Sequence, residues 1–339
     1  MTADRNLITD IPGVLVGSAQ DERLASGVTV AVLDGAAAVA CAVHGGSPGS
    51  RETSLLEPEM TASGADAIVL SGGSAFGLDA ASGVQAFMRE HGRGLLFAGL
   101  RIPIVAQAIS FDLLNGGDKD WGRYPPYREL GYAAAAAAGP AFALGTAGGG
   151  YGATTANLKG GLGSASAETA SGFRVGALVV VNAIASAVMG SGPHFWAAPY
   201  EEGAEFGGLG LPPALTPEMR RLAWKGQPRA PADGVPGTTI ALVATDARLT
   251  KGQTKRLAIA AAGGLHKALR FANAATDGDA VFAAAMGRAS RPVEVQDMNE
   301  LGAVAGDCLA RAIARGVFEA TALPFPGALP AWRDLFGRA

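Results

Sequence analysis

Thr238-Thr-Ile-Ala-Leu-Val-Ala-Thr245 is the stretch that decides the fold, since its apolar and β-branched residues predict a strand in the protein core. The segment before it, from Gly207 to Gly237, is rich in proline and glycine, which predicts an exposed or mobile linker. Directly after the strand, Thr250-Lys-Gly-Gln253 has the pattern of a capping box and predicts the start of a helix. The apolar face of this helix would carry Leu257, Ala261, Leu265 and Leu269.

Further strands and helices are predicted on both sides of this stretch. Short apolar runs bounded by turns predict strands over 28–33, 37–43, 67–70 and 176–181. Helices are predicted over 77–90, which has apolar residues at helical spacing, and over the alanine run 133–138. The length of 339 residues permits one large domain or two. Strands and helices mixed in this order predict a layered α/β (α+β) domain.

The composition is typical of a globular protein. The chain has a formal net charge of −3 and 49% hydrophobic residues, which argues against disorder and against nucleic-acid binding. Its most apolar stretch, 175–190, is too short to span a bilayer, and the first residues do not form a signal peptide. Two cysteines, Cys41 and Cys308, provide neither a disulfide framework nor zinc-site spacing. We therefore expect a soluble, cytoplasmic protein that binds no membrane and no nucleic acid.

Several motifs resemble known sites but lack a required residue. Gly45-Gly-Ser-Pro-Gly49 matches a nucleophile elbow, yet Pro48 lacks the backbone N–H of the oxyanion hole, so we reject a serine-hydrolase triad there. The glycine-rich segments 72–77 and 148–152 match neither the dinucleotide fingerprint nor a P-loop. The histidines, His44, His91, His194 and His266, have no metal-ligand spacing. We expect neither a cofactor nor a metal.

Two segments carry candidate chemistry. Asp277-Gly278-Asp279 places two carboxylates on one face if it is extended, although a solvated turn fits the same residues. At the junction of Gly237 and Thr238 the linker meets the core strand. If that bond were cut, Thr238 would carry a free α-amine with a pKa of about 7.7–8.0, able to act as the base for its own hydroxyl. An ordinary boundary between a loop and a strand fits these residues as well.

Five segments together resemble the L-aminopeptidase/D-esterase family. They are Ile8-Thr-Asp-Ile-Pro-Gly-Val-Leu-Val-Gly17, Arg51-Glu-Thr53, Ala67-Ile-Val-Leu-Ser-Gly-Gly-Ser-Ala-Phe-Gly-Leu-Asp-Ala-Ala81, Leu158-Lys-Gly-Gly-Leu-Gly163 and Gly237-Thr-Thr-Ile-Ala-Leu-Val-Ala-Thr-Asp246. Within that family the chain is most similar to the nylon-oligomer hydrolases, which act on 6-aminohexanoate oligomers. The resemblance implies an αββα sandwich of the N-terminal-nucleophile hydrolase type. It also implies a single catalytic domain, 1–339, that cuts itself between Gly237 and Thr238 into associated fragments 1–237 and 238–339.

The resemblance further implies the catalytic residues. Thr238 matches the nucleophile, and Asp277 and Asp279 match the two positions that would stabilise the ammonium form of its amine. Lys159 matches a lysine that would keep that amine neutral and favour the developing alkoxide. Asn182 matches an asparagine that would donate an N–H group to the oxyanion.

One position departs from the aminopeptidase pattern. Ala156 stands where related aminopeptidases have an active-site tyrosine. Tyr124 or Tyr127 would then supply the phenol at the substrate or oxyanion.

We therefore predict a self-processing amide hydrolase with an N-terminal threonine nucleophile. Its substrates would be 6-aminohexanoate oligomers or small peptides. One alternative is an aminopeptidase for L-α- or β-amino N-termini with D-esterase activity, and another is a non-catalytic binding module on the same fold. Low charge and apolar surfaces predict a homo-oligomer, and the resemblance implies a homotetramer.

Overall fold

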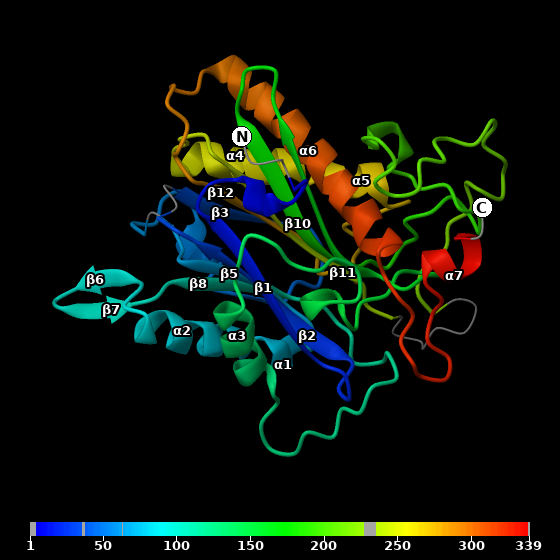
Figure 1. The fold of residues 1–339 in the computed structure, drawn as a ribbon, viewed down its shortest axis with the longest axis horizontal. Coiled ribbons are helices and arrows are strands. Elements are labelled where there is room, and N and C mark those ends of the chain that lie inside the picture. Colours follow the sequence, from blue (N-terminus) through cyan, green and yellow to red (C-terminus); the bar gives the residue numbers. More distant parts are fainter. Residues whose placement is uncertain (1–4, 36–37, 63, 227–234, 338–339) are drawn as a thin grey trace.

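Two five-stranded sheets pack face to face in the computed structural model, which describes residues 5–35, 38–62, 64–226 and 235–337 (Figure 1). The first sheet has the order β1 (Val14–Asp21), β2 (Ser26–Leu33), β5 (Ala67–Ser71), β8 (Val105–Ile109) and β4 (Ser50–Arg51). The second has the order β3 (Ala38–Val43), β12 (Ala280–Ala285), β11 (Thr238–Thr245), β10 (Arg174–Asn182) and β9 (Gly161–Glu168).

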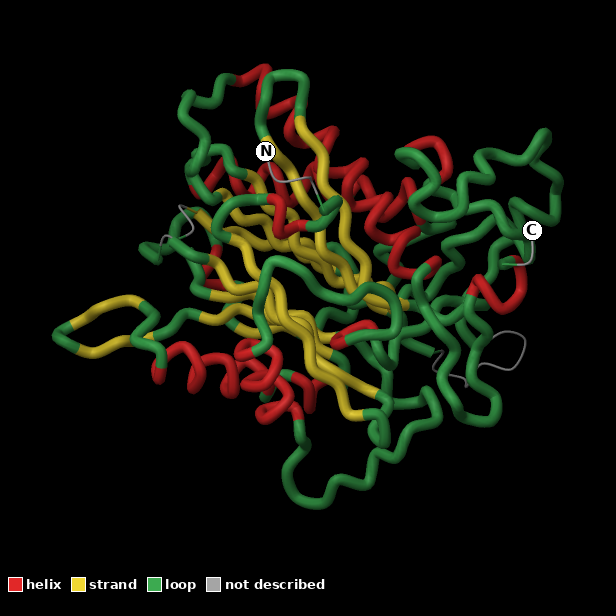
Figure 2. The backbone as a smooth tube through the Cα atoms, viewed as in Figure 1, coloured by secondary structure: helices red, strands yellow, loops and turns green. Residues whose placement is uncertain are grey.

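Helices cover the outer face of each sheet, which gives four layers (Figure 2). The first sheet is covered by α2 (Ala80–Glu90) and α3 (Tyr127–Ala136), with the short α1 (Ser74–Gly77) beside them. The second is covered by α4 (Lys251–Ala261), α5 (Gly263–Ala268) and α6 (Val295–Phe318), and α7 (Trp332–Phe336) follows near the C-terminus. Single 3-10 turns lie at Ile8–Asp10, Ser54–Leu56, Gly148–Gly150 and Ala198–Tyr200. The predicted αββα sandwich is confirmed.

Strand β11 lies in the middle of its sheet and is buried on both faces. Its even-numbered residues Ile240 and Leu242 belong to the core between the sheets, whereas Ala241 and Val243 pack beneath the helices. This alternation is the ordinary pleat of a strand. Thr238 therefore shares the face of Ile240, and Thr239 shares the face of Ala241.

Most predicted elements are confirmed, with shifted ends. The strand 238–245 is observed with the same bounds, and the strands predicted over 28–33, 67–70 and 176–181 lie within β2, β5 and β10. Strand β3 begins at Ala38, since residue 37 lies outside the described residues. The capping box forms, with Gln253 N donating to Thr250 Oγ1 at 3.2 Å and Thr250 N donating to Gln253 Oε1 at 2.9 Å.

The predicted helices are divided or shifted. The helix predicted over 77–90 begins at Ala80, after the separate turn α1. The apolar face predicted from Leu257 to Leu269 is buried but is shared between α4 and α5, because the helix is interrupted before two glycines. Helix α3 begins at Tyr127, before the alanine run, and ends at Ala136.

A hairpin of β6 (Leu95–Phe97) and β7 (Leu100–Ile102) projects from the first sheet beside α2 (Figure 1). All six of its strand residues are exposed, and five of them are apolar. The hairpin is therefore an exposed apolar surface. The predicted homotetramer stays a prediction. Within the described ranges, none of the helices combines the length and apolarity needed to cross a membrane.

Candidate active site

The predicted catalytic residues meet at one edge of the second sheet. Strands β11 and β12 are parallel, and β10 is antiparallel to β11. The first residues of β11 and β12 and the last residue of β10 therefore lie side by side. Thr238 begins β11 opposite Asn182, which ends β10, and Asp279 directly precedes β12. Segments far apart in the sequence are thus combined in one cluster.

The carbonyl group of Gly237 lies between two hydrogen-bond donors. The Thr238 hydroxyl donates to this oxygen, and the backbone N–H of Gly278 donates to it at 3.1 Å. Thr238 is only 4% exposed. A Cβ atom on Gly237 would lie 2.2 Å from the backbone nitrogen of Ile184, so residue 237 must be glycine in this arrangement. The hydroxyl is therefore beside the carbonyl that it would attack, and Gly278 is placed to stabilise the negative charge.

Asp277 and Asp279 are both buried beside this carbonyl. The Asp279 carboxylate accepts hydrogen bonds from Thr239 N at 2.6 Å and Asn273 N at 2.8 Å, and Asp277 accepts one from Ala274 N at 3.2 Å. Burial raises the pKa of Asp277, and burial together with the charge of Asp277 raises the pKa of Asp279. The two carboxyl groups thus share a buried site, and the solvated-turn alternative is wrong.

Burial of Asp279 has a consequence for stability. Its pKa rises from the usual value near 4 to about 7, so the folded chain binds this proton more tightly than the unfolded chain. The free energy of unfolding should therefore fall as the pH rises from about 4 to 7. Asp279→Asn removes this titration. We expect wild type to lose about 2–4 kcal/mol more stability than Asp279→Asn between pH 4 and pH 7.5 in denaturant titrations. Equal pH dependence of the two proteins would contradict this assignment.

Asn182 and Lys159 are buried in the same region. The Asn182 side chain donates from Nδ2 to the carbonyl oxygen of Phe111 at 2.8 Å, and its Oδ1 accepts from Thr154 N at 3.0 Å. Lys159 donates from Nζ to the carbonyl oxygens of Gly150 and Gly160, at 2.9 Å each. Desolvation lowers the pKa of Lys159 to about 7. Lys159 lies on the segment that pairs with Thr154, and the hydrogen bonds from its Nζ go to these two carbonyl oxygens rather than to Thr238.

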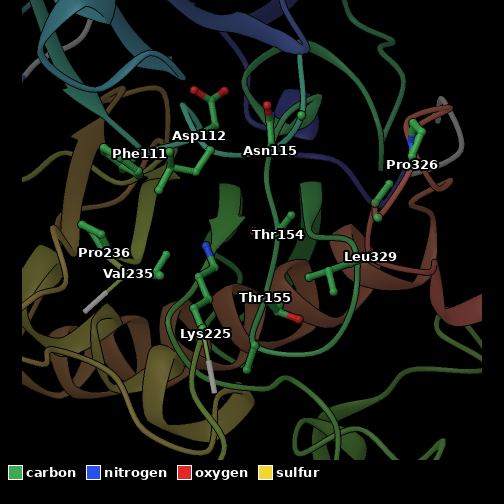
Figure 3. Close-up of a pocket in the computed structure, with 16 residues that line it drawn as sticks. Phe111, Asp112, Asn115, Thr154, Thr155, Lys225, Val235, Pro236, Pro326 and Leu329 are labelled. Atoms are coloured by element: carbon green, nitrogen blue, oxygen red, sulfur yellow. The ribbon is translucent and has the colours of Figure 1, made fainter. Parts of the chain in front are cut away.

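A cavity of about 360 Å³ opens beside this cluster (Figure 3). Its walls include Phe111 and Asp112 after β8, Thr154, Lys225, and the pair Val235-Pro236 that precedes Gly237. A second cavity of about 410 Å³ is apolar and also borders Val235. It is lined by Ile184, Leu222, Trp224, Val235, Phe271 and Thr276. The segment before Gly237 therefore borders both the first cavity, whose walls mix polar and apolar side chains and which is called the polar cavity below, and the apolar second cavity.

The two tyrosines considered as phenol donors lie elsewhere. Tyr124 is 77% exposed. Tyr127 is buried in α3, and its hydroxyl donates to Ser26 Oγ at 3.0 Å; Ser26 in turn donates to Asp112 at 2.6 Å. Ala156, by contrast, lines the polar cavity. The geometry therefore gives no support to a phenol from Tyr124 or Tyr127.

Sequence analysis missed three residues at this site. Lys225 falls in the predicted linker, yet it is only 6% exposed, because Trp224 pairs with Ala185 and Lys225 N donates to Ile184 O at 3.0 Å. The linker prediction is wrong at this point, and its residues 227–234 lie outside the described residues.

Asp112 carries a buried carboxyl group whose pKa is raised by desolvation. A carboxylate soon after the mostly apolar stretch 105–109, which becomes β8, was the available signal for Asp112. The third is Gly278, whose backbone donor has no sequence signal.

Across the ranges that the structure describes, no group of three or more His, Cys, Asp or Glu residues is arranged to hold a metal ion.

Comparisons with known proteins give a consistent result. A model of peptidase family S58 matches residues 6–328. An uncharacterized aminopeptidase of Mycobacterium tuberculosis is 41% identical, over 98% of this chain and 98% of that protein. An uncharacterized aminopeptidase of Mycobacterium leprae is 39% identical, over 97% of this chain and 96% of that protein.

Two solved structures share the fold. A β-aminopeptidase of Burkholderia sp. superposes with a TM-score of 0.69 at 23% identity, covering 97% of this chain and 91% of the other. An L-aminopeptidase D-Ala-esterase/amidase of Ochrobactrum anthropi, described as a variant of the Ntn hydrolase fold, has a TM-score of 0.65 at 18% identity, covering 100% and 96%. The fold is therefore that of the N-terminal-nucleophile hydrolases, as predicted.

Proposed function

Because this chain belongs to peptidase family S58, we propose that it is a self-processing aminopeptidase whose nucleophile is Thr238. Family membership makes the chain a peptide amide hydrolase, which disfavours the non-catalytic binding module. One observation carries the proposal: the Gly237 carbonyl oxygen accepts hydrogen bonds from both the Thr238 hydroxyl and Gly278 N–H. The hydroxyl group and the carbonyl group that would react are thus in direct contact, which supports an attack by Thr238 on its own preceding peptide bond.

Self-processing begins with an N→O acyl shift. Thr238 Oγ attacks the carbonyl carbon of Gly237, and the oxyanion is stabilised by Gly278 N–H and by Asn182, the cross-strand partner of Thr238. The bond between Gly237 C and Thr238 N breaks, and the hydroxyl proton passes to that nitrogen. Water then hydrolyses the ester. This releases the Gly237 carboxylate and leaves Thr238 with a free hydroxyl and a free α-amine.

Turnover uses the new amine as the base. It takes the proton from Thr238 Oγ while that oxygen attacks the substrate carbonyl, and it returns the proton to the leaving amine. Asp277 and Asp279 stabilise the ammonium form between these steps, and Asn182 contributes to the oxyanion site. Water then hydrolyses the ester formed on Thr238 and restores the free enzyme.

The substrate class follows from the space around Gly237, because a substrate's acyl group takes the place of this residue. A Cβ atom there would lie 2.2 Å from Ile184 N and 2.5 Å from Asp277 Oδ1. Acyl groups whose α-carbon carries no side chain therefore fit best. We propose a preference for β-aminoacyl amides over L-α-aminoacyl amides. A 6-aminohexanoyl group also has no side chain on its α-carbon, and its methylene chain suits the adjoining apolar cavity. We therefore propose 6-aminohexanoate oligomers as a second substrate class.

A panel of p-nitroanilides tests this preference. We expect β-alanyl and 6-aminohexanoyl anilides to be hydrolysed with kcat/KM values roughly 10-fold or more above that of L-alanyl anilide. Glycyl anilide is the matched control, since it differs from L-alanyl anilide only by the Cβ atom, and it should also exceed the L-alanyl compound. Faster release from L-alanyl anilide than from both the glycyl and the β-alanyl compounds would contradict the proposed substrate class.

A further inference from the structure

We propose that Lys225 is a positioning residue for Thr238 chemistry, which acts by fixing the orientation of the Asn182 side-chain amide. The inference rests on the proposed function, since it assigns a role within the same site. Lys225 belongs to the segment 207–237, which its composition predicts to be a linker.

Hydrogen bonds from both its backbone and its side chain hold Lys225 in place. Its backbone N–H donates to Ile184 O at 3.0 Å, directly after the pairing of Trp224 with Ala185. Its Nζ donates to two oxygens of Asn182, the backbone carbonyl and Oδ1, at 2.8 Å each. Figure 3 shows the side chain among the lining residues of the polar cavity, with its nitrogen end directed toward the middle. A buried lysine with two contacts to a single residue is well placed to orient that residue.

The contacts determine which end of the Asn182 amide faces which way. An ammonium group has only hydrogen-bond donors, so the atom that it meets must be the amide oxygen. Oδ1 accepts from both Lys225 Nζ and Thr154 N, and Nδ2 is therefore turned to the side of Phe111 O, in the wall of the polar cavity. Asn182 is the cross-strand partner of Thr238. Without Lys225, a reversed amide would lose fewer hydrogen bonds, and Nδ2 would no longer be fixed on the side of Phe111.

The charges around Lys225 suit this role. Asp277 and Asp112 are the acidic groups that act on it, and Lys159 is the basic group that it influences. Desolvation lowers the pKa of Lys225 to about 7. The neighbouring carboxylates oppose this effect and favour the charged form that donates to Asn182.

A double-mutant cycle on self-cleavage tests the inference. The first-order cleavage of newly synthesised precursor is followed on denaturing gels for wild type, Lys225→Met, Asn182→Ala and the double variant. We expect Lys225→Met to slow cleavage on the order of 10²-fold, as a misplaced group does, and Asn182→Ala on the order of 10²–10³-fold. If Lys225 acts through Asn182, adding Lys225→Met to Asn182→Ala should slow cleavage less than about 3-fold. Lys225→Arg, which keeps the donors, should recover much of the rate.

Controls separate positioning from a loss of stability. Lys251→Met is matched, because Lys251 Nζ also donates to two carbonyl oxygens, those of Leu55 and Met60, and Lys251 begins α4, away from the candidate site. It should leave the cleavage rate unchanged. If Lys225→Met does not fold, the cycle is run with Lys225→Gln, whose side chain is one atom shorter. If the two fold-losses in cleavage rate multiply in the double variant, Lys225 does not act through Asn182, and only this inference is overturned. If the wild-type chain is not cut at all, the proposed function is overturned as well.

Discussion

Thr238→Ala is expected to leave the chain uncut and to lower amide hydrolysis by about 10⁶-fold, as loss of the nucleophile does in other hydrolases. Alanine has no oxygen to attack the Gly237 carbonyl, so the peptide bond before residue 238 stays intact. The α-amine that serves as the base is then never released. A single substitution thus removes both the nucleophile and the base. Denaturing gels and p-nitroaniline release measure the two losses separately.

Two variants serve as controls for this prediction. Thr238→Ser keeps the hydroxyl group and should retain both self-cleavage and turnover. Thr239→Ala is matched, because Thr239 is the next residue of the same strand, is equally buried, and lies on the opposite face. It should cleave at nearly the wild-type rate. Self-cleavage by purified Thr238→Ala would exclude Thr238 as the nucleophile.

Asp277→Asn is expected to lower turnover on the order of 10³–10⁴-fold while leaving the fold intact. The amide oxygen of asparagine can still accept the hydrogen bond from Ala274 N, so little local structure is lost. The negative charge beside Gly237 is removed, however, and the ammonium form of the Thr238 amine then loses its counter-ion. The rate of substrate hydrolysis, with thermal unfolding recorded in parallel, measures this effect.

Asp246→Asn is the matched control for the charge at Asp277. Asp246 follows the other end of β11 and accepts a hydrogen bond from Arg174 N at 2.9 Å. Its loss of charge should change neither processing nor turnover. If Asp277→Asn retains near wild-type turnover, the carboxylate has no part in stabilising the amine.

Elements buried on both faces were predictable from the sequence. Strand β11 reads as a continuous apolar run because it is central in its sheet, and the run 176–181 in β10 is apolar for the same reason. Helix boundaries were less predictable, because the spacing of apolar residues does not mark them. The break between α4 and α5 falls just before Gly263-Gly264, and α3 begins directly after Pro126, so local helix breakers set these ends.

The candidate site was predictable only where its residues carry a motif. Thr238 and the Asp277–Asp279 pair stand at a strand start and beside a turn, and the fold brings them together at one sheet edge. Lys225 was hidden, because the composition around it is that of a loop and its burial depends on pairing with the exit of β10. For Tyr127 the sequence suggests suitable chemistry, but the structure shows its hydroxyl bonded to Ser26, and no observed contact supports a role as phenol donor.

Intact mass spectrometry of the purified wild-type chain tests the central claim most directly. The account predicts two fragments, 1–237 and 238–339, with an unmodified threonine at the new N-terminus. A single mass for the whole chain in a fully active preparation would contradict it, since Thr238 would then have no free amine to act as its base.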